Sequence, residues 1–310
     1  MSGGASSVHL TAIVPATNRP ATIERCVDAI RRADDPPEEL IVVEEPPKSG
    51  PAHARNLGAL EATGDILVFV DSDVIVHRDA FRRIRAAFAA SPRLDALFGS
   101  YDDAPEAPGA VSGFRNLLHH DVHQRSAGPA ATFWAGLGAV RRELFLRAGG
   151  FDAARFPLPS IEDVELGARL AAGGARIELD PELLGTHLKA WTLTEMVRTD
   201  FARRGVPWVS VLLEGQGSAS VLNLGWRHRL SAATCVLGAA ALVRRRPLLA
   251  AAAAASLVAL NHDFYALLLR RRGPVEAAAG VGLHALHHLT GAAAVPAALV
   301  ARSLSARDER

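Results

Sequence analysis

The sequence predicts an α/β fold in which a sheet is flanked by helices, followed by an apolar helical region. Apolar strand-like runs alternate with helix-like segments from residue 8 onward, and the composition becomes alanine-rich and apolar after about residue 228. Alternating strands and helices are typical of a sheet covered by helices on both faces. The chain has 310 residues, enough for about two domains. We therefore expect an α/β domain over 8–225 and an apolar helical region over 228–304.

Three strand and helix pairs fill the first ninety residues. Strands are expected at 8–15, 39–45 and 65–73, which are short apolar runs rich in branched side chains. Helices are expected at 22–33, 51–63 and 79–90, where apolar residues recur at helical spacing, and Thr22 is available to cap the first of them. Strands connected in this way predict parallel pairing.

Bulk composition excludes some classes of function. The net charge is +1, so nothing in the overall balance points to nucleic acid. The two cysteines, Cys26 and Cys235, are far apart and form no zinc or redox motif, which indicates a reducing compartment. The N-terminus has neither a basic start nor an apolar stretch of signal length, so we expect the first half to stay in the cytoplasm.

Polar side chains follow three of the expected strands. Ligands of open α/β sheets bind beyond the carboxyl ends of the strands, so these side chains predict a binding site at that edge. They are Thr17, Asn18 and Arg19 after the first strand, Glu44 and Glu45 after the second, and Asp71, Ser72 and Asp73 after the third.

The pair Asp71 and Asp73 predicts a metal site. Two carboxylates one residue apart at the end of a buried strand repel each other, and a divalent cation such as Mg²⁺ or Mn²⁺ removes that cost. A metal-bridged diphosphate is also a good leaving group. The alternative is an acidic turn that caps the helix expected at Asp79.

The segment LPSIEDVELGARL predicts a helix beginning near Ser160, with Glu162, Asp163 and Glu165 in its first turn. Acidic residues suit the positive end of a helix dipole, and this alone would explain them. The functional alternative is that Glu162 or Asp163 is a general base that deprotonates an acceptor hydroxyl.

Arg55 and His187 are further candidates, and each has a functional and a structural interpretation. Arg55 would lie on the second helix, where it could meet a phosphate, a neighbouring aspartate or only solvent. His187 follows a strand-like segment at 176–186 and is either structural or a ligand for metal or diphosphate. Gly149 and Gly150 predict a turn.

The C-terminal apolar stretches favour membrane association. The first two contain about 13 residues each, short of the ~20 that a spanning helix needs. Arginine triplets at 244–246 and 270–272 border apolar runs, as snorkelling side chains do. Basic residues on both flanks favour a shallow hairpin or an interfacial helix. The alternative is a soluble alanine-rich bundle. His284, His287 and His288 share a helical face, which predicts an interfacial polar stripe in preference to a zinc site.

Taken in order, five segments resemble the family 2 inverting glycosyltransferases, which have the GT-A fold, a Rossmann-type mixed sheet flanked by helices. They cover about residues 8–210 and are TAIVPATNRP, LIVVEE, GPAHARNLGALEATGDILVFVDSDV, GAVRRELFLRAGGFD and IEDVELGARLAAGG. The C-terminal part looks like the membrane-associated end of bacterial members, which implies the cytoplasmic face of the cell membrane and a lipid or polyprenyl-linked acceptor.

The resemblance implies roles for the donor-binding residues. Pro15, Thr17 and Arg19 fall where the first loop meets the nucleotide of a UDP- or GDP-sugar. Glu44 stands where an aspartate usually contacts the uracil or ribose, a departure of one methylene group. Arg55 is counted with this donor-binding set.

The resemblance also implies the chemical groups. Asp71 and Asp73 match the DxD motif, with Asp73 on the metal and Asp71 on the nucleotide. Asp163, next to Glu162, matches the catalytic base, and His187 lies where some members have a metal-binding histidine. The QxxRW motif of processive synthases is absent, which implies transfer of one sugar at a time.

Two other functions compete with this expectation. A nucleotidyltransferase would have a glycine-rich basic loop after the first strand, and ATNRPATIER contains no glycine. A non-catalytic nucleotide-sugar-binding protein would not need Asp71, Asp73 and Asp163 together.

Overall fold

The computed structural model describes residues 8–215 and 225–308. It forms two compact units. Unit 1 contains the described residues up to Asp102 together with His123–Leu188, and unit 2 contains Asp103–Val122 and the described residues from Lys189 onward. These bounds differ from a single division near residue 225, because 103–122 and 189–213 pack with the C-terminal helices. The functional extent of a catalytic domain over 8–225 stays a prediction.

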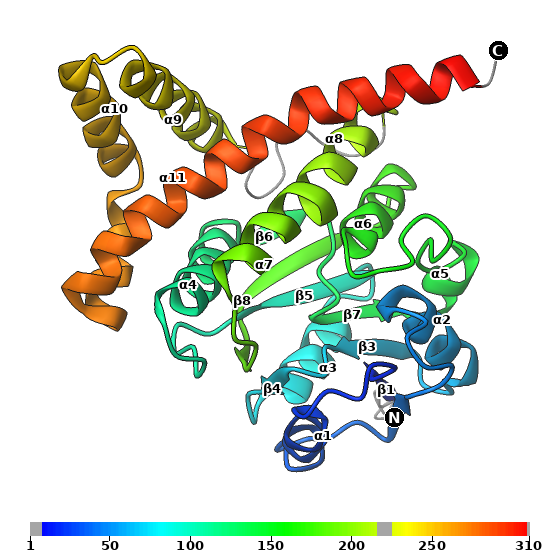
Figure 1. Ribbon diagram of the computed structural model, residues 1–310. Coiled ribbons are helices and arrows are strands. Elements are labelled where there is room, and N and C mark those ends of the chain that lie inside the picture. The colour runs from blue at the N-terminus through cyan, green and yellow to red at the C-terminus, as the bar shows by residue number, and fades with distance from the viewer. Residues whose placement is uncertain (1–7, 216–224, 309–310) are drawn as a thin grey trace. The chain divides into compact units, whose positions relative to one another are not determined.

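Unit 1 is built on an eight-stranded sheet with the order β2-β1-β3-β7-β5-β8-β4, and β6 pairs with β8 (Figure 1). Its strands are β1 (Leu10–Pro15), β2 (Glu39–Val43), β3 (Ile66–Val70), β4 (Val74–Val76), β5 (Ala96–Tyr101), β6 (Gly128–Ala130), β7 (Leu137–Arg141) and β8 (Ile177–His187).

The expected parallel pairing is confirmed for the first three strands, since β1 pairs in parallel with both β2 and β3. Beyond β3 the sheet is mixed. Strand β7 is antiparallel to β3 and to β5, and β4 and β6 are antiparallel to β8, which itself runs parallel to β5. The fold is therefore the mixed α/β sheet that was expected.

The helices of unit 1 begin and end close to their expected bounds. They are α1 (Ile23–Arg31), α2 (Pro51–Glu61), α3 (Ala80–Ala90), α5 (Arg142–Arg147) and α6 (Glu162–Ala172). One detail is wrong: the Thr22 side chain does not cap α1, because its hydroxyl donates to the backbone oxygen of Ser72 at 2.8 Å. Asp79 likewise makes no side-chain cap on α3.

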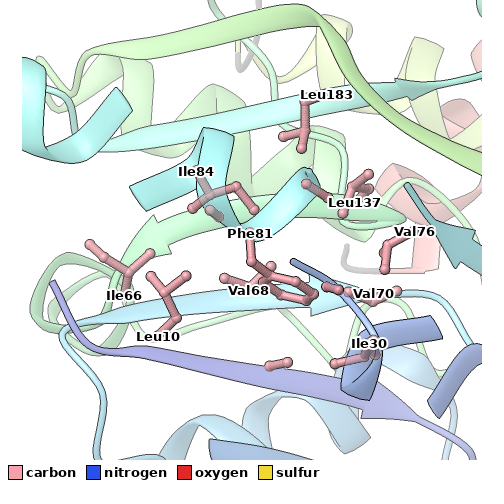
Figure 2. Close-up of a cluster of buried hydrophobic side chains, with 14 of the residues drawn as sticks. Leu10, Ile30, Ile66, Val68, Val70, Val76, Phe81, Ile84, Leu137 and Leu183 are labelled. Atoms are coloured by element: carbon pink, nitrogen blue, oxygen red, sulfur yellow. The ribbon is translucent and has the colours of Figure 1, made fainter. Parts of the chain in front are cut away.

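Both faces of the sheet are covered, as alternation along β3 shows. On one face, Val68 and Val70 lie in a buried cluster with Ile30 of α1 and Phe81 of α3 (Figure 2). On the other face, Phe69 packs against three phenylalanines at ring-centroid distances of 5.2–6.5 Å; these are Phe133, Phe145 and Phe151. Burial on both faces explains why β3 is apolar along its whole length.

Unit 2 is helical. It contains most of α4 (Ala110–Arg125), together with α7 (Leu193–Arg198), a π-helix η1 (Thr199–Gly205), α8 (Val206–Leu213), α9 (Trp226–Val243), α10 (Pro247–Leu260) and α11 (His262–Asp308). Its core joins α4, α7 and α11 through Phe114, Leu117, Met196 and Phe264. The chain leaves helical geometry at Gly273, which has φ 79° and precedes Pro274, so α11 is kinked there.

The histidines of α11 correct one expectation. His284 and His288 are each 2% exposed and do not form a polar stripe on the surface of unit 2. His284 Nδ1 lies 3.0 Å from the Tyr265 hydroxyl, and His287 Nδ1 lies 2.8 Å from a carboxylate oxygen of Asp200. Tertiary packing thus gives these polar side chains internal partners that spacing along one helix cannot reveal.

One helix among the described residues is long and apolar enough to cross a membrane. It covers His262–Leu304, with a mean hydropathy of 1.2 in its most apolar window, and 28% of that window is buried. The shorter α10 is also apolar. These apolar helices are compatible with membrane association.

Candidate active site

The turn that follows β3 carries the paired aspartates. Strand β3 ends at Val70, and the next three residues turn the chain into β4. The Asp71 amide donates to the Gly136 oxygen at 3.0 Å, and the Val74 amide donates to the Asp71 oxygen at 2.9 Å. The backbone of the turn is therefore held on both sides, which fixes the direction of the Asp71 and Asp73 side chains.

Arg55 of α2 is the centre of the site's charge network. It is 4% exposed and donates to Asp71 Oδ1 at 2.5 Å and to Glu162 Oε1 at 3.0 Å. Its guanidinium also lies 5.4 Å from the Phe151 ring centroid. Of the partners expected for Arg55, the structure therefore supplies a neighbouring aspartate and adds a glutamate 107 residues away. A buried arginine that joins two carboxylates ties the β3 turn to the start of α6.

Glu162 and Asp163 are neighbours with different environments. Glu162 is 4% exposed, and both its oxygens are engaged, one by Arg55 and the other by the Ser160 amide at 2.8 Å. Asp163 is half-buried and accepts from the backbone amides of Ala135 at 3.1 Å and Val164 at 2.8 Å. Asp163 thus retains access that Glu162 has lost, and amide donors orient its carboxylate.

The pKa values of Asp163 and Asp71 are raised. Burial and, after it, the Glu162 charge together raise the pKa of Asp163 to about 6, although Arg55 acts in the opposite direction. Burial also raises the pKa of Asp71; Arg55 opposes this, and the nearby Asp73 charge adds to it. A carboxyl with a pKa near neutral pH is suited to exchange a proton during a reaction.

Asp73 and His187 meet because β4 pairs with β8, with Val74 opposite His187. His187 Nε2 lies 3.6 Å from Asp73 Oδ2. The Leu188 backbone amide donates to the backbone carbonyl oxygen of Asp73 at 2.8 Å. The imidazole is 6% exposed and stacks on the Tyr101 ring at 4.1 Å between centroids, with 12° between the planes. The two predicted metal ligands, 114 positions apart in sequence, are therefore adjacent.

These residues suit a divalent cation. A carboxylate and an imidazole side by side can bind a hard or borderline divalent ion whose other positions are filled by diphosphate oxygens and water. Within 8–215 and 225–308, no three histidine, cysteine or acidic residues form a complete metal-binding group. Asp73 and His187 could therefore supply only part of a coordination shell.

The ends of β1 and β2 form the remaining part of the edge. Pro15 pairs with Val43, which brings the loop after β1 beside Glu44, and Thr17 is 7% exposed. Glu44 itself is exposed. Arg19 has a positive φ of 45° and pairs with Glu45 at 3.2 Å, with both side chains mostly exposed. These groups lie where the strand order predicts a nucleotide site, and Arg19 is committed to a surface ion pair.

Sequence reasoning missed several residues that support the site. The Asn56 side chain exchanges two hydrogen bonds with the Phe151 backbone, at 2.8 and 2.9 Å, and so holds the glycine turn at 149–150. Tyr101 and Trp134 pack edge to face at 4.9 Å beside His187. No local pattern marks these contacts, although Asn56 directly follows a residue that was already a candidate.

The mixed sheet and its acidic edge define a class, the GT-A-type glycosyltransferase fold. The mannosyltransferase PcManGT from Pyrobaculum calidifontis, solved in complex with GDP-Man and Mn²⁺, superposes with a TM-score of 0.55 at 20% identity and covers 93% of this chain and 87% of that one. At this identity the similarity concerns the fold.

Sequence comparison gives matches to glycosyltransferases. Residues 44–146 match the model of glycosyl transferase family 2. A pre-mycofactocin glycosyltransferase of Mycobacterium tuberculosis is 27% identical over 264 residues, which is 77% of this chain and 52% of that protein. An uncharacterized glycosyltransferase of Haemophilus influenzae is 23% identical over 188 residues, which is 50% of this chain and 60% of that protein. Together, the family model, the relatives and the shared fold support a glycosyltransferase of family 2. It spans about half the length of the first of these relatives.

Proposed function

We propose that this chain transfers a sugar from a nucleotide-sugar donor, a UDP- or GDP-sugar, to a hydroxyl group of a lipid or lipid-linked acceptor. The transfer inverts the anomeric centre, adds one sugar at a time and depends on Mg²⁺ or Mn²⁺. The observation that carries the proposal is that Arg55 joins Asp71, at the end of β3, to Glu162, the neighbour of Asp163. In the same turn, Asp73 lies beside His187.

The donor would bind across the ends of β1, β2 and β3. Thr17, Glu44 and the loop containing Pro15 and Arg19 would contact the base and ribose. Asp73 and His187 would hold the cation, with Asp71 facing the nucleotide. When bound, a divalent ion supplies charge stabilisation to the departing diphosphate. The Mn²⁺ and GDP-Man of the mannosyltransferase with the same fold support this choice of ligands.

Asp163 would be the general base. Its carboxylate would remove the proton from the acceptor hydroxyl as that oxygen forms its bond to the anomeric carbon, and the bond from that carbon to the diphosphate breaks. A single displacement of this kind inverts the anomeric configuration. Glu162, with both oxygens engaged, would act as a positioning group that holds Arg55 and the start of α6.

The acceptor and the location follow from unit 2. Its long apolar α11 and the exposed apolar α9 and α10 support association with a membrane, which we propose is the cytoplasmic face of the cell membrane. A lipid-linked acceptor would then diffuse in the same surface to which the enzyme is attached.

The decisive experiment compares Asp163→Asn with the wild-type protein. Loss of a general base lowers turnover by about 10²–10⁴-fold, whereas donor binding measured by calorimetry with Mn²⁺ should stay within a few-fold, because Asn keeps the side-chain shape. Glu143→Gln, on the exposed surface of α5, is the matched control and should leave both values unchanged. Normal turnover in Asp163→Asn would remove Asp163 from the mechanism. No metal-dependent hydrolysis of any UDP- or GDP-sugar by the wild type would favour a non-catalytic binding protein.

A further inference from the structure

Exposed apolar side chains are concentrated in the last three helices of unit 2. Among the residues that the structure describes, 18 large hydrophobic side chains are exposed, and 15 of them lie between Trp226 and Leu304. Nine of them are on α9 and α10, including Leu237 at 68%, Val243 at 84% and Leu248 at 84% exposure. A helix that is apolar on all sides is normally buried, so α9 and α10 need a partner outside the chain.

The two helices form a clamped hairpin. Helices α9 and α10 pack on each other and are joined by Arg244, Arg245 and Arg246 (Figure 1). At the opposite end, the Arg227 Nε donates to the last carbonyl of α10, Leu260, at 3.1 Å. The side-chain amide of Asn261 donates to Ser231 Oγ at 2.9 Å. The hairpin is therefore a built element with one basic end.

The two arginine triplets, alike in sequence, have different roles. Arg271 pairs with Asp103, and Arg272 pairs with Glu276 at 2.7 Å, so most of the second triplet is neutralised within unit 2. Arg244, Arg245 and Arg246 are all exposed and make no ion pair with any described residue. Arg245 has a positive φ of 54°, which belongs to the tight turn. The first triplet is thus a compact cationic group without an internal counter-ion.

We propose that the α9–α10 hairpin lies along the surface of an anionic phospholipid bilayer, with its apolar faces in the acyl boundary and Arg244–Arg246 on lipid phosphates. Clusters of arginine beside apolar helices bind anionic headgroups. The inference rests on the proposed membrane association and specifies its site.

Length and charge decide between this partner and its alternatives. The apolar parts of α9 and α10 have about 13 residues each, or roughly 20 Å of helix, which is less than the ~30 Å of a bilayer core. A spanning hairpin is therefore disfavoured against one lying in the interface. Residues 226–304 contain nine arginines and two acidic residues, Asp263 and Glu276, and both acids have partners within unit 2. A second copy of the same hairpin would bring more cations and no free carboxylate.

The test is co-sedimentation of the full chain with vesicles of phosphatidylcholine alone or mixed with phosphatidylglycerol. We expect binding to the mixed vesicles that weakens as salt is raised. The triple variant R244Q/R245Q/R246Q should lose affinity about 100-fold, since each arginine near an anionic surface contributes roughly one factor of five. The control R31Q/R93Q/R176Q removes three exposed arginines of unit 1 and should bind as the wild type does.

The variant L237S/V243S/L248S separates apolar insertion from charge, and should reduce binding to both kinds of vesicle while its circular dichroism stays unchanged. Equal binding of the arginine variant and the wild type would overturn the proposal, as would concentration-dependent dimerisation without any vesicle binding. Vesicle binding needs neither donor nor acceptor. If vesicle binding is found while sugar transfer is not, the proposed sugar transfer fails and this inference stands. If transfer is found without vesicle binding, this inference and the proposed membrane location fail, while the sugar transfer stands.

Discussion

At the residue scale, the site depends on how two adjacent acids are divided between structure and chemistry. Glu162 is buried, with one oxygen on Arg55 and the other on a backbone amide, while Asp163 is half-buried and held only by amides. Both carboxylates accept hydrogen bonds at both oxygens, so the two acids differ in exposure and in the partner Arg55, which donates to Glu162. This difference supports Asp163 as the proposed base.

The raised pKa of Asp163 gives a pH prediction. Burial, then the Glu162 charge, raises this pKa to about 6. If Asp163 is the base, it is protonated and inactive in most molecules below that pH. We expect kcat/KM to fall about tenfold per pH unit below about pH 6. A carboxyl whose pKa is raised on folding stabilises the folded chain most at pH values below its unfolded pKa of 3.8, and this contribution is lost as pH rises through 6.

The Asp163→Asn variant has no ionisable group at residue 163, so its stability does not decrease with pH in this way. The difference in unfolding free energy between the variant and the wild type should therefore grow between about pH 4 and pH 6 and stay constant above it. Urea unfolding at pH 4, 6 and 8 measures this difference. A constant difference at all three values would mean that burial does not perturb Asp163.

A second prediction at the residue scale concerns Tyr101. Its ring stacks on His187, whose Nε2 faces Asp73. We expect Tyr101→Ala to free the imidazole and to weaken Mn²⁺ binding in the presence of nucleoside diphosphate about tenfold, as loss of groups that orient a ligand does. Tyr101→Phe keeps the ring and should bind Mn²⁺ normally. Electron paramagnetic resonance of free Mn²⁺ reports this directly, and equal affinity in Ala and Phe variants would contradict a positioning role.

At the scale of elements, the start of α6 is aligned by close backbone contact. A Cβ atom on Gly167 would lie 2.1 Å from the Phe133 amide nitrogen, so α6 can approach the segment before β7 only because residue 167 is glycine. That same segment supplies the Ala135 amide to Asp163. The position of the base thus depends on a residue one turn further along the helix.

Gly167→Ala is therefore expected to destabilise unit 1 by about 1–3 kcal/mol and to lower activity, although alanine favours helix. Gly282→Ala in α11, where a Cβ atom would meet nothing within 4 Å, is the control and should be neutral or slightly stabilising. Thermal unfolding followed by circular dichroism compares the two. Similar melting temperatures in both variants would show that α6 can shift without cost.

At the scale of the whole molecule, every candidate site residue belongs to unit 1, whereas the apolar helices belong to unit 2. Ligands that bind only the folded chain stabilise the part that holds their site. Donor binding and membrane binding should therefore be separable in experiments on the intact chain.

A thermal-shift screen of nucleotide sugars tests this division. A UDP- or GDP-sugar with Mn²⁺ at 100 times its Kd should stabilise unit 1 by about 2.7 kcal/mol. If unfolding occurs in two transitions, one should move and the other should not. Asp73→Asn should remove the increment that depends on Mn²⁺. A donor-induced shift of equal size in both transitions would contradict the assignment of the site to unit 1 alone.

The strands, the helices and the acidic strand ends of residues 8–90 could be predicted from sequence because they depend on local periodicity. A run such as ILVFV followed by Asp71, Ser72 and Asp73 specifies a buried strand with a polar carboxyl end wherever it lies. The same local logic identified Glu162 and Asp163 in the first turn of a helix.

Only the tertiary structure decided which distant groups meet. The pairing of β4 with β8 brings His187 to Asp73, and Arg55 joins Asp71 to Glu162. Tyr265 and Asp200 give internal partners to His284 and His287 of α11. The two arginine triplets have the same sequence. Only the folded structure shows that the second triplet makes ion pairs, with Asp103 and Glu276. Local patterns record what one segment prefers, while a charge acquires its role from the groups that folding brings within a few ångströms of it.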